Sequence, residues 1–411
     1  MHFKFRTAGE SHGRGLVCMI EGVPAGLALS AARDIDPDLR RRQGGYGRGG
    51  RMKIERDAAE VVAGVRLGET IGSPLAFLVW NRDWENWRVA MDPEAPAGES
   101  PRLKRVHLPR PGHADLVGVL KYDRDDARDI LERASARETT ARVVAGAVAK
   151  RLLAEFDITI GSHIVMMGGI EAKRPDPLPD DINAAADASP VRTLDADAES
   201  RMIEAIDDAK SRGDTLGGVF EVVARGVPAG LGSHVSWDRK LDGRIAHAMM
   251  SIQAMKGVEI GMGFEASRRP GSQVHDEIER APELRNTGGF RRLSNSAGGL
   301  EGGITTGEPV VVRVAMKPLS TLMQPLRSVD LRTGDSADAI RERSDVAALA
   351  AAGVVGEAML AIVLADAVLE KFGGDSLGEL KRNFESYLAQ LDSRSLRLDR
   401  ATDREADAEP S

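Results

Sequence analysis

A six-residue segment occurs twice in this chain, and this repeat limits the possible folds more than any other sequence feature. Gly22-Val23-Pro24-Ala25-Gly26-Leu27 is repeated letter for letter at residues 226–231. Proline fixes φ and glycine permits positive φ, so the same letters favour the same bend. Both copies follow a strand-like run and precede a charged helix candidate. A common turn used twice by chance remains an alternative, but the repeat favours an internal duplication.

The remaining pattern predicts an α+β protein, because strands and helices are interleaved without a regular βαβ period. Strand-like runs cover 2–8, 53–66, 74–81, 157–168, 217–226 and 309–317. Helical patterns cover 34–42, 124–155 in two pieces, 199–212, 239–252, 346–372 and 376–391. We expect one domain over 1–391, made of similar halves near 1–150 and 216–391. We also expect a long ordered loop at 83–112, a surface insertion near 171–198 and a disordered tail at 392–411.

Composition excludes several classes of protein. Hydrophobic residues make up 42% of the 411, but no apolar run approaches the ~20 residues of a membrane span. We therefore expect no membrane partner. The first residues lack the apolar stretch of a signal peptide. The single cysteine, Cys18, cannot form an internal disulfide, which agrees with a cytoplasmic location and leaves no Cys-based metal site. We expect no metal.

The charge is uneven along the chain. The net charge is −7, whereas a general nucleic-acid binder should be basic, so no nucleic-acid partner is expected. Residues 40–56 are nevertheless strongly basic, with Glu55 as the only acidic residue. Arg42 and Arg48 head this segment, and guanidinium groups bind phosphate and carboxylate bidentately. The segment predicts a site for a small, highly charged anion; a solvated basic face is the alternative.

Two glycine motifs are poor matches to the functions they usually indicate. Residues 45–50 fit G-x-G-x-x-G, but a helix candidate precedes them and a strand-like run follows, the reverse of a dinucleotide-binding turn. Residues 9–13, Gly-Glu-Ser-His-Gly, fit the nucleophile elbow G-x-S-x-G. That elbow requires a helix after the turn, and the following residues are strand-like. A serine hydrolase therefore stays only as a rival enzyme class.

Two histidines lie in settings suited to proton transfer. His12 and His113 have glycine neighbours, which leave an imidazole free to reach a ligand near neutral pH. Each could instead only cap a turn. Asp345 directly precedes the longest helical pattern, so it is either a helix N-cap or a catalytic carboxylate. Ser135 and Glu138 fit a capping box at a new helix start, which would form a phosphate site or an ordinary cap.

Eight segments occur together in an order and spacing that closely resemble chorismate synthase. They cover the chain from about residue 3 to about residue 385. The segments are Gly9–Gly13, Arg41–Arg51, Arg110–Asp115, Arg133–Thr139, Ser251–Gly261, Asn295–Gly303, Lys317–Thr321 and Arg343–Asp345.

The resemblance implies a β-α-β sandwich, a homotetramer and reduced FMN as cofactor. It implies 5-enolpyruvylshikimate 3-phosphate as substrate and an anti-1,4-elimination of phosphate that gives chorismate without net redox change, the last common step of the shikimate pathway. NADPH is a flavin reductant for some members. A substrate with two carboxylates and a phosphate agrees with the basic segment, and the flavin supplies chemistry that side chains lack. A non-catalytic anion- or flavin-binding protein is the alternative from another class.

The resemblance also assigns roles to residues. His12 would protonate the departing phosphate, His113 would maintain the flavin's protonation state, and Asp345 would assist proton removal through the flavin N5. Arg42 and Arg48 match positions for NADP or substrate anions. Gln253 replaces a common asparagine, and Val346-Ala347 lack a common cysteine. The positions that match flavin contacts are Arg133, Ala134, Ser135, Gln253, Ala254, Gly302, Lys317, Pro318, Leu319, Ser320, Thr321 and Arg343.

Overall fold

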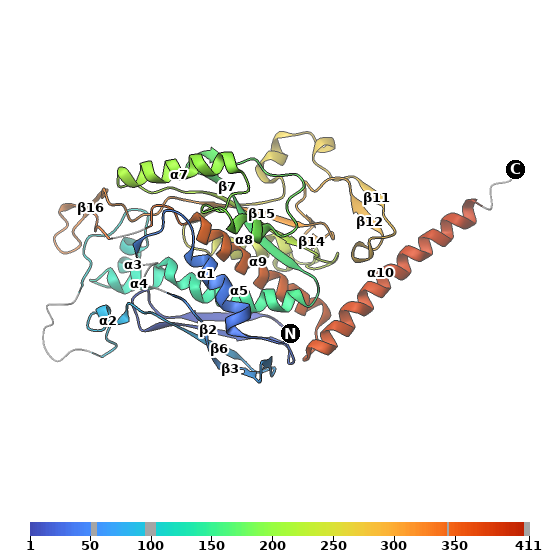
Figure 1. The fold of residues 1–411 in the computed structure, drawn as a ribbon, viewed down its shortest axis with the longest axis horizontal. Coiled ribbons are helices and arrows are strands. Elements are labelled where there is room, and N and C mark those ends of the chain that lie inside the picture. The colour runs from blue at the N-terminus through green and yellow to red at the C-terminus, as the bar shows by residue number, and fades with distance from the viewer. Residues whose placement is uncertain (51–55, 95–103, 343–344, 407–411) are drawn as a thin grey trace.

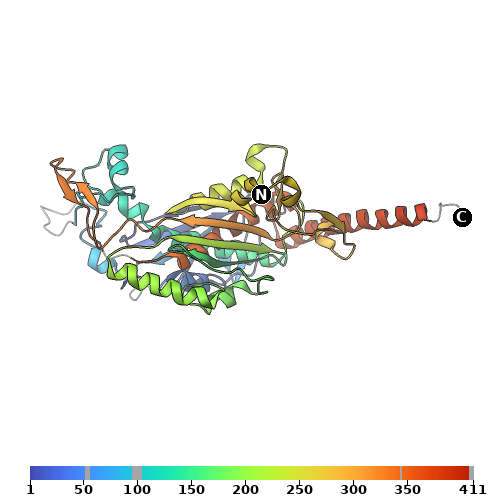
Figure 2. The same cartoon turned by 90° about the horizontal axis from the view of Figure 1, so that it is seen from above.

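Two antiparallel sheets enclose a central pair of helices in the computed structural model of the chain (Figure 1). The structure describes residues 1–50, 56–94, 104–342 and 345–406, with side chains to residue 395. Figure 2 shows the same layers from above, with the final helix extending away from the body. The α+β class and the sandwich expected from the sequence are therefore confirmed.

The first sheet has four strands in the order β1-β2-β6-β3. In β2 the side chains of Leu16, Cys18 and Ile20 are buried, and those between them are exposed. This period of two places one face on the core and the other in solvent. The strands are β1 (Lys4–Ala8), β2 (Gly15–Glu21), β3 (Glu60–Ala63) and β6 (Leu75–Trp80).

The second sheet has five strands in the order β10-β15-β9-β7-β8. β9 is buried along almost its whole length, because both faces of this sheet are covered. The first strand of this sheet in chain order is β7. The sheet therefore includes residues that precede position 216, where the second half of the chain is expected to begin. The strands are β7 (Thr159–Met167), β8 (Ile170–Glu171), β9 (Gly218–Arg225), β10 (Met255–Ile260) and β15 (Val310–Met316).

Helices α5 (Thr139–Ala154) and α9 (Leu349–Phe372) form the layer between the sheets. A Cβ on Gly146 would lie 2.2 Å from the Cβ of Ala358, so only glycine allows the two helices to approach this closely. α9 is apolar and long enough to cross a membrane, but 94% of its most apolar window is buried inside the protein. Among the described residues it is therefore the core helix of the sandwich.

The two copies of the repeated hexapeptide form the same hydrogen bonds. Thr70 and Thr305 occupy equivalent places, and each hydroxyl donates to the proline carbonyl of its turn at 2.6 Å. Each threonine N–H also donates to the last leucine carbonyl at 2.9 Å, and each threonine carbonyl accepts from the second glycine N–H at 2.8 Å. The outer strand order β1-β2-β6-β3 parallels β7-β9-β15-β10. From these matching contacts we propose that the chain consists of two duplicated halves.

Residues 171–198 are more than a surface insertion. They contain α6 (Ile182–Asp187), whose Ile182 packs against β9 and β15 through Val223 and Val311. Arg192 is only 4% exposed. Since the second sheet would otherwise expose these apolar side chains, the segment covers its outer face together with α7 (Ala196–Ser211).

Within the described residues, one long helix, α10 (Leu377–Ala406), continues past residue 392, where the sequence predicts the start of a disordered tail. Arg285 pairs with Asp392 and Arg280 donates to Ser395, so contacts hold the helix beyond the expected boundary. The absence of proline and of interior glycine lets the helix continue from there. Residues 407–411 lie outside the described residues.

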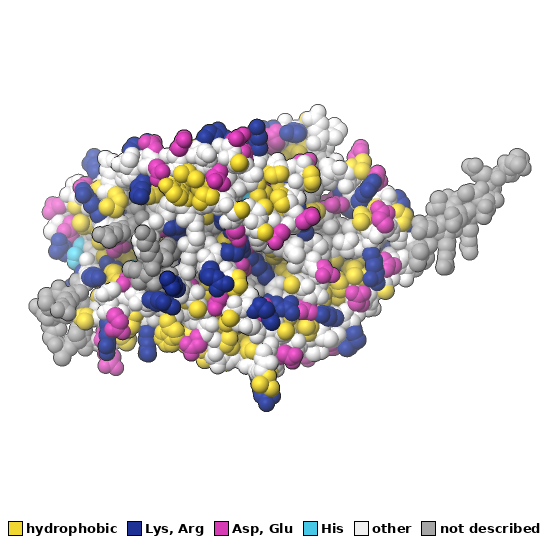
Figure 3. All heavy atoms as spheres, in the orientation of Figure 1, with side chains coloured by type: hydrophobic (Ala, Val, Ile, Leu, Met, Phe, Trp, Pro, Cys, Tyr) yellow, Lys and Arg dark blue, Asp and Glu magenta, His cyan; other side chains and the backbone are white. Residues whose placement is uncertain are grey.

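The remaining elements surround the sandwich. On the view of Figure 3, basic and acidic side chains are intermixed rather than gathered into one basic field. The other helices are α1 (Asp36–Gln43), α2 (Trp84–Trp87), α3 (Asp115–Tyr122), α4 (Arg128–Ala134) and α8 (Leu241–Met250). The hairpins pair β4 (Val65–Arg66) with β5 (Glu69–Thr70), β11 (Ile278–Arg280) with β12 (Phe290–Arg292), β13 (Leu300–Glu301) with β14 (Ile304–Thr305) and β16 (Arg327–Val329) with β17 (Ser336–Asp338).

Candidate active site

The Gly-Glu-Ser-His-Gly turn joins β1 to β2 at one end of the first sheet. The backbone N–H of Ser11 donates to the carbonyl of Glu132 at 2.9 Å. Asn81 donates to the carbonyl of Gly13 at 2.6 Å. A strand rather than a helix follows the turn, so the serine hydrolase alternative is not supported. These bonds make an otherwise flexible glycine turn a fixed platform.

His12 is fixed on this platform by two neighbours. Its Nδ1 lies 2.9 Å from Oε1 of Glu132, and its backbone N–H donates to Oε2 of the same carboxylate at 2.8 Å. Its ring stacks on Trp87 with centroids 3.8 Å apart and planes at 24°. Burial would raise the pKa of Glu132, but hydrogen bonds from His12 and Arg128 outweigh this and lower it. Glu132 is therefore a carboxylate at neutral pH.

His113 has a similar carboxylate partner. Its Nδ1 pairs closely with Oδ1 of Asp115, which has no solvent exposure. Arg110 donates to Oδ2 of the same aspartate at 2.8 Å and also bonds the hydroxyl of Thr321 at 2.9 Å. Burial alone would raise the pKa of Asp115, but the bonds from His113 and Arg110 hold it below its usual range. Both expected catalytic histidines thus pair with ionised carboxylates.

A chain of alternating charges connects the two histidine–carboxylate pairs. Glu342 lies 3.7 Å from Arg110 and 3.3 Å from Arg128. Arg128 in turn pairs with Glu132 at 2.9 Å. This charge chain runs from His113 through Asp115, Arg110, Glu342, Arg128 and Glu132 to His12. His12 and Glu342, which are 330 positions apart in sequence, thereby share one network, and this network connects the two histidines.

Arg42 lies beside this site but points inward. It is only 5% exposed, and it donates to the hydroxyl of Thr139 at 3.0 Å and to the carbonyl of Ala136 at 2.8 Å. Burial lowers the pKa of Arg42 to about 9, opposed by Asp57 and assisted by the charges of neighbouring arginines. Arg137 is equally buried and pairs with Asp57 at 2.7 Å. Two buried guanidinium groups therefore share one aspartate.

Asp345 lies against the basic segment rather than at the start of α9. Its Oδ1 accepts from the backbone N–H of Gly49 at 2.6 Å, and its Oδ2 lies 3.2 Å from Nε of Arg48. The N-cap position of α9 is Ala348, so the helix-cap interpretation of Asp345 is wrong. The carboxylate is too far ahead of the first helical turn, because residues 346–347 precede the helix and donate their backbone N–H groups to the carbonyl of Gly47. Arg343 lies outside the described residues.

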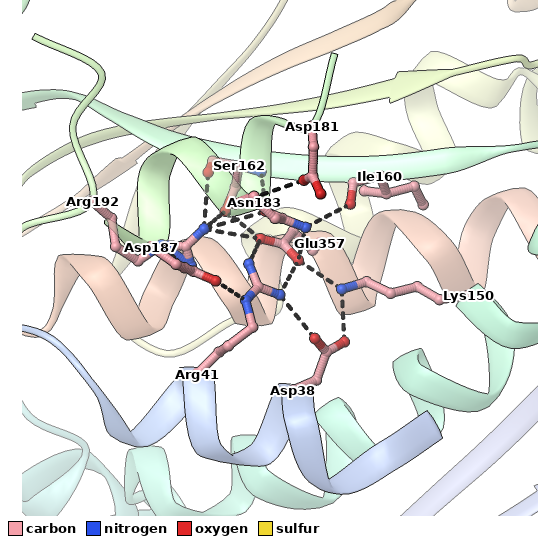
Figure 4. A network of polar contacts seen from close by, with 11 residues as sticks. Asp38, Arg41, Lys150, Ile160, Ser162, Asp181, Asn183, Asp187, Arg192 and Glu357 are labelled. Carbon is pink, nitrogen blue, oxygen red and sulfur yellow. Dashed lines mark hydrogen bonds and ion pairs between the residues drawn. The ribbon is translucent and has the colours of Figure 1, made fainter. Parts of the chain in front are cut away.

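The basic segment divides between two sites. Arg42 bonds Thr139 and Arg48 pairs with Asp345, whereas Arg41 points to a separate buried cluster around Glu357 (Figure 4). Neighbouring positions on a helix point in directions about 100° apart, which separates Arg41 from Arg42. The positive charge of residues 40–56 is therefore only partly available to a ligand, because Arg41 is paired with Glu357.

The break between α4 and α5 forms without the expected capping box. Ser135 accepts a hydrogen bond from the N–H of Arg137 at 3.2 Å, not from that of Glu138. The carboxylate of Glu138 is instead bonded to Thr7 at 2.6 Å and to Arg142 at 2.8 Å. The first turn is a 3-10 turn, so the serine reaches the second N–H of the helix. Ser135 also donates to the hydroxyl of Ser11 at 3.2 Å.

Five of the expected flavin positions lie at this break or next to a residue that contacts it. Arg133 is partly exposed and donates to the carbonyl of Gly9 at 3.1 Å, beside Ala134 and Ser135. Gln253 donates to Glu138 at 3.1 Å. Its buried Oε1 has no hydrogen-bond partner among the described residues. The next residue, Ala254, has φ of +70°, which L residues rarely adopt, so its backbone is held under strain.

The 317–321 segment connects these positions to His113. The N–H of Lys317 donates to the carbonyl of Ala254 at 3.0 Å, and its Nζ donates to the carbonyl of Gly112 at 3.0 Å. Pro318 follows beside Gly217, and the carbonyl of Leu319 accepts from Thr215 at 2.7 Å. A Cβ on Gly112 would lie 3.7 Å from Ser320, and Thr321 bonds Arg110. Residues 317–321 therefore connect Ala254 to Gly112 and Arg110, so the flavin positions and His113 are joined by one continuous set of contacts.

Among the expected flavin positions that the structure describes, Gly302 is the one that does not join this set of contacts. It lies in the β13–β14 hairpin, where the carbonyl of Gly303 accepts from Leu241 at the start of α8. Gln253 follows the other end of α8, about 15 Å away along a ten-residue helix. Figure 1 likewise shows β14 on the opposite side from α3 and α4.

Comparison with known proteins decides which family this site belongs to. The sequence model of the family described as "Chorismate synthase" matches residues 3–369. The chain belongs to the chorismate synthase family. Chorismate synthase of Geotalea daltonii is 56% identical over 395 residues, which cover 95% of this chain and 99% of that one. The protein of that name from Aquifex aeolicus is 55% identical over 402 residues, covering 95% and 99%.

A solved structure agrees with this result. The chain superposes on one described as "Crystal Structure of Chorismate Synthase" with a TM-score of 0.75 and 46% identity, covering 96% of this chain and 99% of that one. Members of the chorismate synthase family are lyases that depend on reduced flavin and act on a small molecule. The family assignment made from eight sequence segments is therefore confirmed.

Several residues of the site were not predicted from the sequence. They are the carboxylates and cations that hold the histidines, and the aromatic ring that stacks on His12. Glu132 and Arg128 look like an ordinary i,i+4 helix pair, and Trp87 lies in a loop without periodicity. The only sequence signal was the position of Arg110, Asp115 and Arg137 inside segments that match the family. The missed residues are Asp57, Asn81, Trp87, Arg110, Asp115, Arg128, Glu132, Arg137 and Glu342.

Proposed function

We propose that this chain is a chorismate synthase that eliminates phosphate from 5-enolpyruvylshikimate 3-phosphate to give chorismate. In this anti-1,4-elimination a ring C–H bond and the C–O bond to phosphate break, and the electron pairs move to form the second ring double bond. The single observation that carries the proposal is the charge chain joining His12 to His113. Two acid–base groups at fixed separation suit a reaction that releases a proton and an oxyanion.

The buried arginines support a substrate with several negative charges. Arg42 and Arg137 pair with Asp57, and Arg48 pairs with Asp345. Three guanidinium groups gathered in a site largely removed from water suit an anionic substrate. Guanidinium groups match phosphate and carboxylate in geometry as well as charge. A non-catalytic anion-binding protein would require the arginines but not the paired histidines.

The residues around the α4–α5 break fit a flavin, which we propose is FMN. The buried Oε1 of Gln253 lacks a partner and can accept a hydrogen bond from a heterocyclic N–H. Arg133 and Lys317 provide cations for a phosphate group, and burial together with Lys256 lowers the pKa of Lys317. When bound, the reduced flavin supplies the electron-rich chemistry that a side-chain base lacks.

The protein groups then have separate tasks. His12 donates a proton to the departing phosphate, and Glu132 compensates the imidazolium. His113 exchanges a proton with the cofactor through its other ring nitrogen, because Asp115 accepts at Nδ1. Asp345 assists removal of the ring proton, and Arg48 fixes its orientation.

Anaerobic incubation with photoreduced FMN and substrate tests the proposal. Stoichiometric release of phosphate with formation of chorismate is the expected result, and the absence of phosphate release overturns it. Replacing photoreduced FMN by FMN plus NADPH in air decides whether the chain also reduces its own flavin.

We also propose a homotetramer located in the cytoplasm. A second copy offers a way to bring Gly302 to the flavin, since one chain holds it at a distance. Light scattering on the purified protein gives the oligomeric state, and a monomer that turns over at full rate contradicts this arrangement.

A further inference from the structure

The imidazole of His12 is restrained on two sides, by Glu132 and by Trp87. Glu132 contacts the ring edge at Nδ1 and also the backbone N–H of the same residue. Trp87 covers the ring face at stacking distance. The histidine lies between Ser11 and Gly13 in a glycine turn, which by itself leaves the ring many orientations. These two contacts remove that freedom.

The two neighbours are themselves anchored. Trp87 donates its indole N–H to Asp83 at 3.0 Å, and Nζ of Lys104 lies 3.8 Å from its ring centroid. The guanidinium of Arg128 lies 5.0 Å from the same centroid and also pairs with Glu132. Arg128 therefore joins the stacking partner of His12 to its hydrogen-bonding partner. The three groups form one rigid bracket around the imidazole.

We propose that Glu132 and Trp87 are positioning residues for His12. The carboxylate accepts from Nδ1–H, and the indole holds the ring plane, so proton donation takes place at Nε2. The inference rests on the proposed function, because it assigns a purpose to the orientation of a proton donor. Carboxylates that fix the tautomer and direction of a histidine have this effect in other acid–base sites.

Glu132→Gln tests the hydrogen-bonding half of the bracket. The amide keeps the shape but can turn its NH₂ toward His12, which favours the wrong tautomer. We expect kcat to fall by about 10²-fold, the usual contribution of a positioned proton-transfer group, while substrate KM changes little. Asp129→Asn is the matched control, because it neutralises an exposed carboxylate on the same helix, one that pairs with Arg124. The control should retain its kcat.

Trp87→Leu and Trp87→Phe test the stacking half. Phenylalanine keeps an aromatic face against the imidazole, so it should restore most of the kcat that leucine loses. Trp84→Leu, on the same short helix, is the control and should leave kcat unchanged. A merely structural role for the indole predicts equal loss with both replacements, accompanied by lower thermal stability, and this result overturns the proposal.

Proton NMR of the full-length protein with labelled histidines measures the geometry without turnover. A ring stacked on indole experiences a ring-current shift, and His12→Ala identifies its resonance among the eight histidines. We expect Trp87→Leu to move this resonance strongly and Glu132→Gln to move it if the ring turns. An unmoved resonance in Trp87→Leu overturns the bracket. If Glu132→Gln does not fold, the Trp87 variants still decide the question.

The same series separates this inference from the proposed function. Full turnover by His12→Ala removes the proton-donor role itself, whatever the bracket does. Loss of turnover in His12→Ala, together with wild-type kcat in both Glu132→Gln and Trp87→Leu, overturns only the positioning role.

Discussion

Arg41 and Glu357 form a bidentate ion pair inside the sandwich, with both nitrogen–oxygen distances at 2.9 Å. Glu357 is fully buried on α9, and Lys150 from α5 also bonds its carboxylate. α6 contributes Asn183 to the same cluster (Figure 4). The pair thus joins the central helices to α1 and to the segment that covers the second sheet. It also directs one arginine of the basic segment away from the active site.

We expect Glu357→Gln to destabilise the protein strongly. Removing one partner of a buried ion network leaves uncompensated charge, which costs about 3–5 kcal/mol. Chemical denaturation at pH 7 measures the free energy of unfolding. Asp208→Asn, which breaks the exposed pair with Arg212, is the control and should change stability little. A similar small change for both variants would falsify the structural role of the cluster.

Glu221 should contribute to acid unfolding. Burial alone would raise its pKa, but hydrogen bonds from His163 and Arg174 outweigh burial and lower it to about 2. Because the pKa of Glu221 in the folded protein lies below the ordinary glutamate value of 4.5, the stabilisation is complete above pH 4.5 and is lost as pH falls toward 2. Urea denaturation between pH 6 and pH 2 measures the free energy of unfolding. This free energy should fall less with decreasing pH for Glu221→Gln than for wild type. An unchanged pH dependence contradicts this.

His113→Ala should lower turnover by about 10²-fold or more while FMN still binds, because proton transfer contributes roughly that factor. Single-turnover phosphate release and a flavin titration measure the two quantities separately. His275→Ala replaces an exposed histidine that is not a member of the charge chain. It should keep wild-type turnover and flavin binding. Near wild-type turnover by His113→Ala would remove the residue from the mechanism.

Arg48→Ala should raise the substrate KM much more than it weakens flavin binding. A lost charge-assisted contact to phosphate or carboxylate costs about 1.5–3 kcal/mol, roughly a tenfold to hundredfold change. Arg212→Ala, an exposed surface arginine, serves as control. Parallel titrations with substrate and with flavin measure the two affinities. Equal weakening of both contradicts the assignment of Arg48 to the substrate rather than to the flavin.

Cys18 should be unreactive in the folded protein. It is 1% exposed, and burial raises the pKa of its thiol to about 12, so the reactive thiolate is scarce at neutral pH. Iodoacetamide should label it only after unfolding, which makes the single cysteine a probe of global opening. Rapid labelling under native conditions contradicts the buried position.

The local elements and the family followed from the sequence because both depend on short segments. The repeated hexapeptide indicated a shared bend, and both copies use a threonine to close it. Gly9–Gly13 and Lys317–Thr321 are weak signals alone, and their order and spacing together with six other short segments indicated the family. Helix and strand periodicity likewise depends only on adjacent residues.

The partners of those residues depended on tertiary structure. Arg41 and Arg42 are identical in sequence terms, yet one neutralises Glu357 and the other borders the active site. Ser135 and Glu138 fit a capping box, but the side chains of Thr7, Arg142 and Gln253 compete for the glutamate. Burial and charge pairing are decided by groups distant in the chain, because desolvation and Coulomb energy depend on distance in space. The sequence determined which groups could perform the chemistry, and the packing of the two sheets decided which of them meet.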